Sequence, residues 1–473
     1  MGLPNVMLTG RSGMMAARSA IGTTGHNIAN ANTEGYNRQR VELETQEPTA
    51  NQGYKGFIGR GTQIARVSRI NDEYLDKQIR NGNRSLQFME EKDLSLRQTE
   101  DIFNEMNGEG LNRLMAKFFN EFRQLANDPN SEAIRQSVRE ATNAMTSDFK
   151  RMRGEVDDVR RHIDNRIEGY TREVNQLADQ IANMNQKILQ LEIGGGSPND
   201  LLDQRDLAVK KLASYMDVSV HKSKNGSVTI NIVGAGPLVT GPKAEQFNVQ
   251  RSPRDDDGKP ENALDIYSSS SANSNVTHVI KGGKLGALVE VRDQTLGTIL
   301  SRMDDLAFGI TESVNAIHRQ GLTRDGVTGI DFFKPQTEKF RAAEYFGLSD
   351  DILASTNNIA TAAQPDSPGD NRIAIAISGI QSMRLMNDGK ATMDDWYNSI
   401  VSDIGVVTAR NRDDLNQQKS IMTQLDKIRD QISNVSIDEE TANLLEFQHS
   451  FDASAKVIAV ADEMLKTVLD LKR

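Results

Sequence analysis

The chain has 473 residues, with 56 Lys and Arg against 66 Asp and Glu, so its formal net charge is −10. A nucleic-acid-binding protein needs surplus cations to displace phosphate counterions, and this deficit argues against that class. The absence of Cys excludes disulfides, thiolate metal sites and Cys nucleophiles. No stretch approaches the roughly 18 apolar residues of a membrane span, so we expect no membrane insertion.

The N-terminal segment carries a heptad pattern. Apolar residues recur every seven positions, and small or short residues follow three positions after each of them. The small positions permit close approach of a neighbouring helix, but the glycines in this segment weaken an isolated helix. The segment lacks the apolar core and early cationic cluster of a cleavable secretory signal. The heptad residues are Met7, Met14, Ile21 and Ile28.

The C-terminal segment carries the same period. An acidic cluster at residues 438–440 marks the start of a helix, where negative charge complements the helix dipole. The heptad residues are Ile437, Leu444, Phe451, Ile458 and Leu465. Either segment alone is compatible with an ordinary amphipathic helix on a core. Both together predict that the two ends of the chain pair with each other or with further copies, and that they become ordered on assembly.

The middle of the chain is predicted to be mainly helical. Helices are expected over 85–106, 111–127 and 132–150, and a separate periodic run over 156–191 predicts a rod of roughly 50 Å. After the glycines at 194–196, Asn199 or Asp200 is expected to cap a shorter helix that extends to Leu212. Helix resumes from Leu285 and ends at Gly321.

Two regions carry the two-residue period of strands. Residues 40–45, followed by Ile64 and Val67, predict an early β-hairpin. Between 218 and 280, short strands with a turn at Asn225-Gly226 predict a small antiparallel β unit inserted between two helical arms; its last strand is expected over 276–280.

We find no pattern that supports catalysis. The six His residues all lie more than ten positions apart, so no local metal-ligand spacing exists. Neither a phosphate-binding loop, nor a dinucleotide fingerprint, nor a calcium loop, nor a nucleophile elbow is satisfied. No cofactor and no metal are therefore expected.

One segment closely resembles the N-terminal signature of bacterial flagellar axial proteins, the rod, hook and hook-associated proteins. It extends from His26 to Gln39, and we assign the signature to Asn27, Ala29, Asn30, Thr33, Gly35, Tyr36 and Arg38. These residue types also predict the end of a helix and a turn. Asn30 and Asn32 can compete for backbone hydrogen bonds and end the helix, Gly35 can take positive φ, and Tyr36 can anchor the turn.

Further segments resemble the hook-associated protein 1 family, whose members form the first hook–filament junction layer. They include 199–206, 282–288 with 291–293, 315–321 with 329–333, 359–360, 369–371 and 439–448. Relatives often carry another β domain after the Asp-Phe-Phe segment, whereas here only residues 334–347 separate Phe333 from Leu348.

This resemblance implies a structural subunit that is not an enzyme and that lies in the extracellular flagellum at the hook–filament junction. It implies a homo-oligomeric ring in contact with the hook protein and the second hook–filament junction protein. It also implies export by the flagellar type III apparatus, with a chaperone on the C-terminal helix. Two alternatives remain open, namely another axial subunit (hook or distal rod protein) and a wall-degrading enzyme fused to axial helices.

The expected fold class is mainly α with an inserted β region. Long helices from the N- and C-terminal halves form a bundle or coiled-coil rod. The expected divisions are terminal heptad helices at 1–36 and 437–473, a helical rod at 37–217 and 283–436 with the early hairpin, and a small β domain at 218–282.

Overall fold

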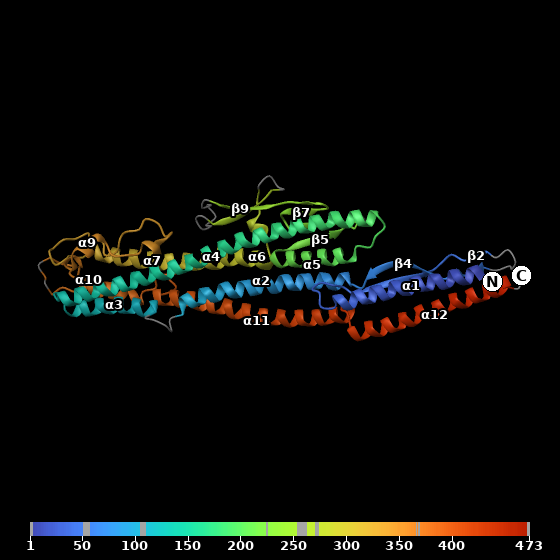
Figure 1. Ribbon diagram of the computed structural model, residues 1–473. Helices are drawn as coiled ribbons and strands as arrows, with labels where there is room; N and C mark the ends of the chain where they lie inside the picture. The colour runs from blue at the N-terminus through green and yellow to red at the C-terminus, as the bar shows by residue number, and fades with distance from the viewer. Residues whose placement is uncertain are drawn as a thin grey trace.

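The chain forms a long, narrow bundle in a computed structural model, with both termini at the same end (Figure 1). The structure describes residues 3–50, 57–104, 110–223, 226–252, 263–269, 274–365, 367 and 369–470. The main helices are α1 (Leu3–Asn30), α2 (Glu73–Phe103), α3 (Leu111–Asn127), α4 (Glu132–Ile193), α5 (Asn199–Tyr215), α6 (Gly283–Glu290), α7 (Gly297–His318), α11 (Met393–Ser433) and α12 (Ile437–Asp470).

Helix α4 runs along the rod (Figure 1). It is one helix of 62 residues, about 93 Å at 1.5 Å per residue, so the predicted division near residue 150 is wrong. The buried positions Phe149, Met152 and Val156 continue at spacings of three and four across that point. Helix α2 also begins earlier than predicted, because the Asp72 side chain accepts hydrogen bonds from the first backbone N–H groups.

The helix that returns from the β unit is continuous but irregular. A π-helical segment, Val291–Leu296, joins α6 to α7, and α7 ends at His318, three residues before the predicted end at Gly321. Shorter helices follow at the far end of the rod: α8 (Ala342–Tyr345), α9 (Asp350–Ala354) and α10 (Arg372–Gly379).

The far end of the rod has an aromatic core. Phe118 and Phe122 of α3 pack against Phe332 and Phe333, with ring centroids 5.3 Å apart for Phe122 and Phe332. All four side chains have no accessible surface. Helix α3 has the predicted bounds, and its strongly one-sided apolar pattern explains this burial.

The inserted β unit lies along one side of α4 and α5 (Figure 1). It has two antiparallel sheets, ordered β5-β6-β7-β8 and β11-β10-β9. The expected strand at 276–280 is wrong, because the last strand is Ser274–Asn275 and a 3-10 turn follows at Thr277–Val279. Asn225 of the expected hairpin turn lies outside the described residues. The strands are β5 (Val218–Lys222), β6 (Val228–Ile232), β7 (Gly236–Thr240), β8 (Lys243–Ala244), β9 (Phe247–Arg251), β10 (Leu264–Ser268) and β11 (Ser274–Asn275).

The early hairpin is present as predicted. Strand β1 (Gln39–Thr45) pairs antiparallel with β4 (Thr62–Arg69), and a second short pair, β2 (Thr49–Ala50) and β3 (Phe57–Ile58), continues the ribbon. A register shift after Glu42 bends the first pair.

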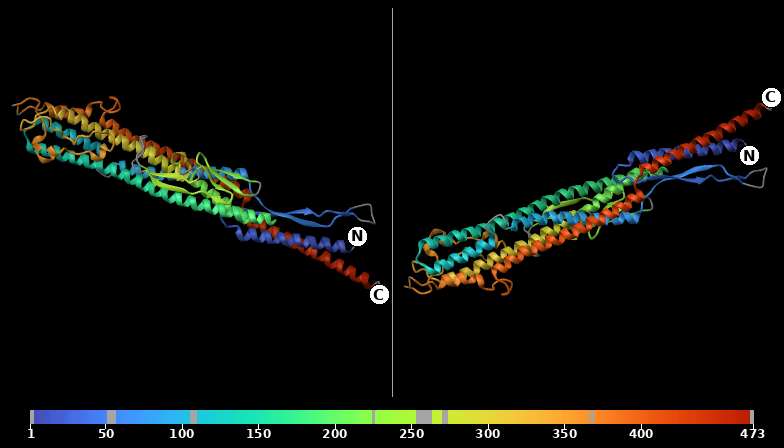
Figure 2. Two further views of the ribbon diagram at one scale, coloured as in Figure 1. Left: turned by 90° about the horizontal axis from the view of Figure 1, so that it is seen from above. Right: turned by 90° about the horizontal axis from the view of Figure 1, so that it is seen from below.

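Helices α1 and α12 form the terminal pair, which extends beyond the rod in both views of Figure 2. They lie side by side at the end opposite the aromatic core, and the early hairpin runs along α1 (Figure 1). Among the described helices, none is long and apolar enough to cross a membrane.

Candidate functional site

The two helices of the terminal pair approach each other through small residues. On α1, Gly10, Ala17 and Ala20 are buried. A Cβ atom on Gly10 would lie 2.7 Å from Ile458 Cγ1 and 3.3 Å from the backbone oxygen of Ser454, and one on Gly13 would lie 2.6 Å from Ser454 Oγ. Any larger residue at these glycines would push the helices apart. The small heptad positions therefore make the closest contact.

The predicted heptad residues surround this contact. Ile437 is 53% exposed. The others are all half-buried: Met7, Met14, Ile21, Ile28, Leu444, Phe451, Ile458 and Leu465. Their role in an interface between copies stays a prediction.

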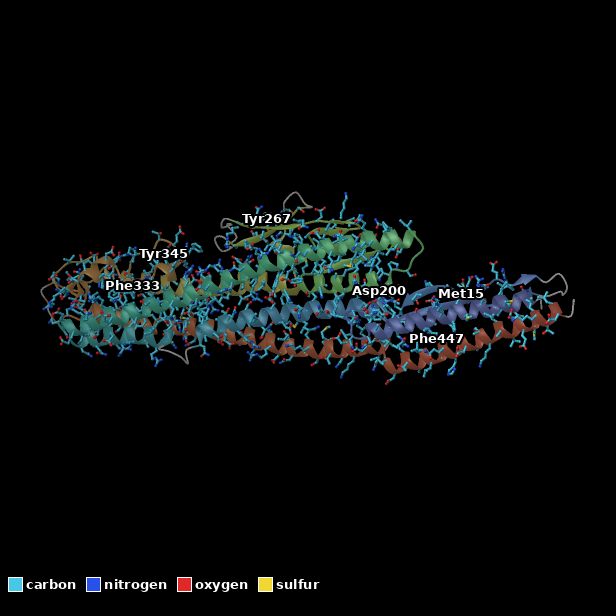
Figure 3. The ribbon with its side chains drawn as sticks, viewed as in Figure 1. Met15, Asp200, Tyr267, Phe333, Tyr345 and Phe447 are labelled. Atoms are coloured by element: carbon cyan, nitrogen blue, oxygen red, sulfur yellow. The ribbon has the colours of Figure 1, made fainter. Side chains whose placement is uncertain are left out.

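The terminal pair retains a large exposed apolar surface. Within α12, Glu440 and Ala461 are the only buried residues among those the structure describes. The exposed large apolar side chains are Leu8 and Met15 on α1 and Ile437, Leu445, Val457, Val460, Met464, Val468 and Leu469 on α12. Figure 3 places Met15 and Phe447 along this pair. A pair that buries so little apolar surface is expected to be weakly stable without partners.

A polar network, here called the anchor, joins the terminal pair to the rod. Asn27 is its centre and is 1% exposed. Its Nδ2 donates to the Gln39 carbonyl at 2.9 Å and to Glu440 Oε2 at 3.0 Å, and its Oδ1 accepts the Gln39 N–H at 2.9 Å. One side chain of α1 thereby fixes both the first strand and the start of α12. The anchor comprises Asn27, Tyr36, Asn37, Arg38, Gln39, Asp203 and Glu440.

Tyr36 and Arg38 complete the contact with α12. The Tyr36 hydroxyl donates to Asn27 Oδ1 at 2.7 Å. Burial, reinforced by three neighbouring carboxylates, raises the pKa of Tyr36, so the hydroxyl stays protonated. Arg38 Nε donates to Glu440 Oε1 at 2.7 Å, and the same guanidinium reaches Glu439 at 2.8 Å. The buried Glu440 carboxylate is therefore both paired and hydrogen-bonded.

The anchor reaches α5 through Asn37. Its backbone N–H and side-chain amide donate to the two oxygens of Asp203, at 3.0 and 2.6 Å. Arg69 of β4 also contacts Asp203, at 2.7 Å, and Asp206, at 3.0 Å. Burial raises the pKa of Asp203, against the opposing effect of these hydrogen bonds. Four segments of the chain thus meet here, namely residues 27–39, Arg69 of β4, the start of α5 and the start of α12. Figure 3 labels Asp200 of α5 at this place.

The remaining signature residues shape the turn. Asn30 Nδ2 donates to the His26 carbonyl at the end of α1, and the Thr33 hydroxyl donates to Asn30 Oδ1 at 3.2 Å. Gly35 has φ +81° and its Cβ position lies 3.1 Å from Leu207, so conformation and space both favour glycine. Ala29 is exposed.

The sequence predicted the segments at 26–39, 199–206 and 439–448 separately but not that they meet. Their convergence depends on partners 166 and 402 positions apart in the chain. The prediction that Asn199 or Asp200 caps α5 is wrong, because Pro198 occupies the N-cap position and forms no side-chain cap. Instead Asn199 Nδ2 donates to the Val67 carbonyl at 2.9 Å, and Asp200 accepts from Gln39 at 2.8 Å.

The described residues contain no cluster of His, Asp or Glu suited to a metal ion. The anchor instead combines hydrogen bonds and ion pairs whose arrangement fixes how two helices leave a rod. It is a structural joint, and the exposed apolar surface beyond it is the candidate assembly site.

Comparison with known proteins identifies the family. The profile described as "Flagellar hook-associated protein FlgK helical domain" matches residues 96–333, about half of the chain. The chain belongs to the FlgK family. It is a structural hook-associated junction subunit of the bacterial flagellum. The terminal segments match other flagellar profiles: "Flagella basal body rod protein" over residues 7–37 and "Flagellar basal body rod FlgEFG protein C-terminal" over residues 430–471.

Curated FlgK-type relatives match over nearly their whole length. "Flagellar hook-associated protein 1" of Bacillus subtilis is 29% identical over 493 residues, which covers 98% of this chain and 97% of the relative. The protein of the same name from Salmonella typhimurium is 24% identical over 552 residues, covering 98% of each chain. This alignment is longer than the 473 residues here, so the Salmonella protein has residues without a counterpart.

The fold is also similar to a solved structure. The flagellar hook junction protein FlgK from Burkholderia pseudomallei superposes with a TM-score of 0.67 at 16% identity, over 76% of this chain and 100% of that chain. The predicted fold class, mainly helical with inserted β structure, is confirmed. The alternative of a hook or distal rod protein is not supported, because the central helical region matches the FlgK profile.

Proposed function

We propose that the chain forms a non-enzymatic ring layer between hook and filament, built from copies that join through α1 and α12. Its neighbours in the axis are the hook protein on one side and the second hook–filament junction protein on the other. It leaves the cell through the flagellar type III apparatus, and a chaperone covers the C-terminal helix before export.

One observation carries the proposal. The two segments that match flagellar rod-protein profiles are brought together as one pair, at one end of the molecule, with apolar side chains facing outward. Large exposed apolar patches mark interaction sites. A subunit joined to its neighbours by this pair leaves the rod and the β unit free to form the outer part of the layer.

Deletion of the gene tests the position in the flagellum. The proposal expects cells with complete hooks, no filaments and flagellin in the medium, and motility restored by the wild-type gene. Filaments of normal number in the deletion strain would contradict it. Immunogold labelling at the base of the filament provides the second measurement, and labelling along the hook would favour a hook subunit instead.

The expectation that the terminal pair becomes ordered on assembly is tested on the purified chain. Limited proteolysis is expected to remove roughly the first 35 and last 35 residues and to leave a stable middle, because weakly packed termini are cleaved first. Termini that resist protease as long as the rod does would show that the pair is already stable alone.

A further inference from the structure

Asparagine side chains of α4 bind the first residues of two strands in the β unit. Asn185 Nδ2 donates to the Val228 carbonyl at 2.9 Å, and its Oδ1 accepts the Val228 N–H at 3.1 Å. Asn175 makes the same two hydrogen bonds to Phe247, both at 2.8 Å. Val228 begins β6 and Phe247 begins β9, so each of the two sheets is bound to α4 at the start of one strand.

Each of these asparagines takes the place of a neighbouring strand. A side-chain amide carries the same N–H and C=O groups as a peptide, and paired residues of an antiparallel ladder exchange two hydrogen bonds in the same way. Outside the β unit, Asn27 binds both groups of Gln39, the first residue of β1. Asn315 of α7 likewise binds both groups of Phe333. Amides on helices are therefore a repeated means of fixing extended segments in this chain.

Asn185 is itself fixed by its surroundings. It is 1% exposed, and Arg205 of α5 donates to its Oδ1 at 3.1 Å and to the Gly226 carbonyl at 2.7 Å. Asn185 Nδ2 also donates to the Gly241 carbonyl, just after β7, at 2.8 Å. The amide cannot rotate without losing these hydrogen bonds, so it presents one geometry to the sheet.

A further contact comes from the π-helical segment between α6 and α7. Arg292, which is 1% exposed, donates from Nη1 to the Leu264 carbonyl at 2.6 Å and to Asp164 of α4 at 2.9 Å. Leu264 begins β10, which pairs with β9. The sheet of β9 is therefore held at two points of α4, Asp164 and Asn175, about 16 Å apart at 1.5 Å per residue. Helices with π turns are rare and such turns occur mostly at functional positions.

Apolar contact alone does not set the orientation of the β unit. Ile181 and Ile188 of α4 share one core with Ile230 and Leu238 of the sheet. Burial of apolar surface is non-directional, whereas hydrogen bonds weaken steeply away from their preferred geometry. The asparagine contacts therefore select one orientation among those that bury similar apolar surface.

We propose that Asn175 and Asn185 are positioning residues that hold the β unit in a single orientation on the rod. The β unit then moves with α4 as one body and does not swing on its two connections, which follow Tyr215 and precede Gly283. Its outer surface is presented at one fixed angle to the rod. The inference concerns the fold of one copy and does not depend on how copies join.

The absence of Cys allows this orientation to be measured in the full chain with paired spin labels and double electron–electron resonance. Labels at Lys243→Cys in β8 and Gln417→Cys in α11 report the sheet of β6 relative to the rod. Labels at Gln250→Cys in β9 and Gln417→Cys report the other sheet. Labels at Val233→Cys and Lys243→Cys report whether the sheet of β6 keeps its own fold. All four positions are exposed.

With the asparagines in place, each pair of labels should give one narrow distance distribution. Asn185→Leu keeps a similar size but removes the hydrogen-bonding groups. It should broaden the distribution between positions 243 and 417, while that between 233 and 243 stays narrow. Exchange of the Val228 N–H should become about tenfold faster or more, as the loss of a buried hydrogen-bond partner implies.

Asn175→Leu should broaden the distribution between positions 250 and 417 to a smaller extent, because Arg292 still holds that sheet. Asn183→Leu is the matched control. It makes the same change at an exposed position of α4 and should leave every distribution unchanged.

Three results would overturn the proposal. The first is a narrow, unshifted distribution between positions 243 and 417 in Asn185→Leu, because apolar contact would then suffice. The second is broadening between positions 233 and 243 as well, since Asn185 would then be needed for the fold of the sheet. The third is a broad distribution in the chain that retains both asparagines. If Asn185→Leu yields no folded chain, a narrow distribution between positions 250 and 417 in Asn175→Leu overturns the proposal instead.

Discussion

The two ends of the molecule are stabilised in opposite ways. At the far end of the rod, the aromatic side chains of α3 pack with Phe332 and Phe333 until none retains accessible surface. At the other end, the described part of α12 buries only Glu440 and Ala461. The end with the aromatic core is therefore expected to be stable on its own, whereas the terminal pair is expected to need neighbouring copies. The single Trp, Trp396, donates to the Arg302 carbonyl near the aromatic end and therefore reports on the rod alone.

The largest effect is expected in the aromatic core. Phe332→Ala removes a ring that contacts Phe122 and His318 and leaves a cavity, so it should lower the free energy of unfolding by about 3–5 kcal/mol. Urea titration followed by Trp396 fluorescence measures it. Leu353→Ala, at a position 50% exposed, is the control and should stay within about 0.5 kcal/mol. Equal effects of the two substitutions would show that the Phe332 ring contributes no more to stability than an exposed side chain.

A second effect at this end depends on pH. His318 Nδ1 donates to the Ile330 carbonyl at 2.7 Å, and its Nε2 accepts the Ala360 N–H at 2.8 Å. Burial lowers the pKa of His318 to about 4, so on acidification the unfolded chain gains a proton near the ordinary pKa of 6.5 while the folded chain does not. Stability is therefore lost as pH falls through that window.

Between pH 7 and pH 4.5 the wild-type chain should lose about 2–3 kcal/mol more than His318→Gln, which cannot titrate there. Trp396 fluorescence in urea at each pH measures the difference. Parallel pH profiles for the two chains would show that His318 is accessible to protons in the folded rod.

A substitution in the anchor should destabilise the chain less than Phe332→Ala does, and only in the segments that the anchor joins. Asn27→Ala leaves the Gln39 N–H and one oxygen of Glu440 without their partner, at a cost of about 1–3 kcal/mol. Hydrogen exchange should become faster in α1 and at the start of α12, while the rod stays protected. Asn32→Ala, at an exposed position of the same turn, is the control. Faster exchange in both variants would indicate that the turn itself, and not the anchor, holds the helices.

The smallest effect on the rod is expected from charge on the terminal pair. Leu444→Asp or Phe451→Asp should change the unfolding reported by Trp396 by less than about 0.5 kcal/mol, yet abolish incorporation into flagella and motility. Ala459→Asp adds the same charge at an exposed position of α12 and should preserve motility. Normal motility with Phe451→Asp would show that this heptad position is not part of the assembly interface.

Local periodicity predicted a large part of this fold from the sequence. The bounds of α3, the hairpin of β1 and β4 and the helices at both ends follow from repeats within a few turns or strands. The continuity of α4 was missed because its polar residues obscure the pattern near Lys150. The anchor was missed because Asn27, Asp203 and Glu440 carry no period, and only the tertiary fold brings their hydrogen-bonding groups together.

The position of the two connections to the rod has a mechanical consequence. The chain enters the rod through the early hairpin and α2 and leaves it through α11, and both connections lie beside the anchor at the same end (Figure 1). A pull on the terminal pair is consequently divided between two covalent paths that act in parallel. The ion pair of Arg38 and Glu440 bridges these paths, so tension on either helix is shared before it reaches the aromatic end.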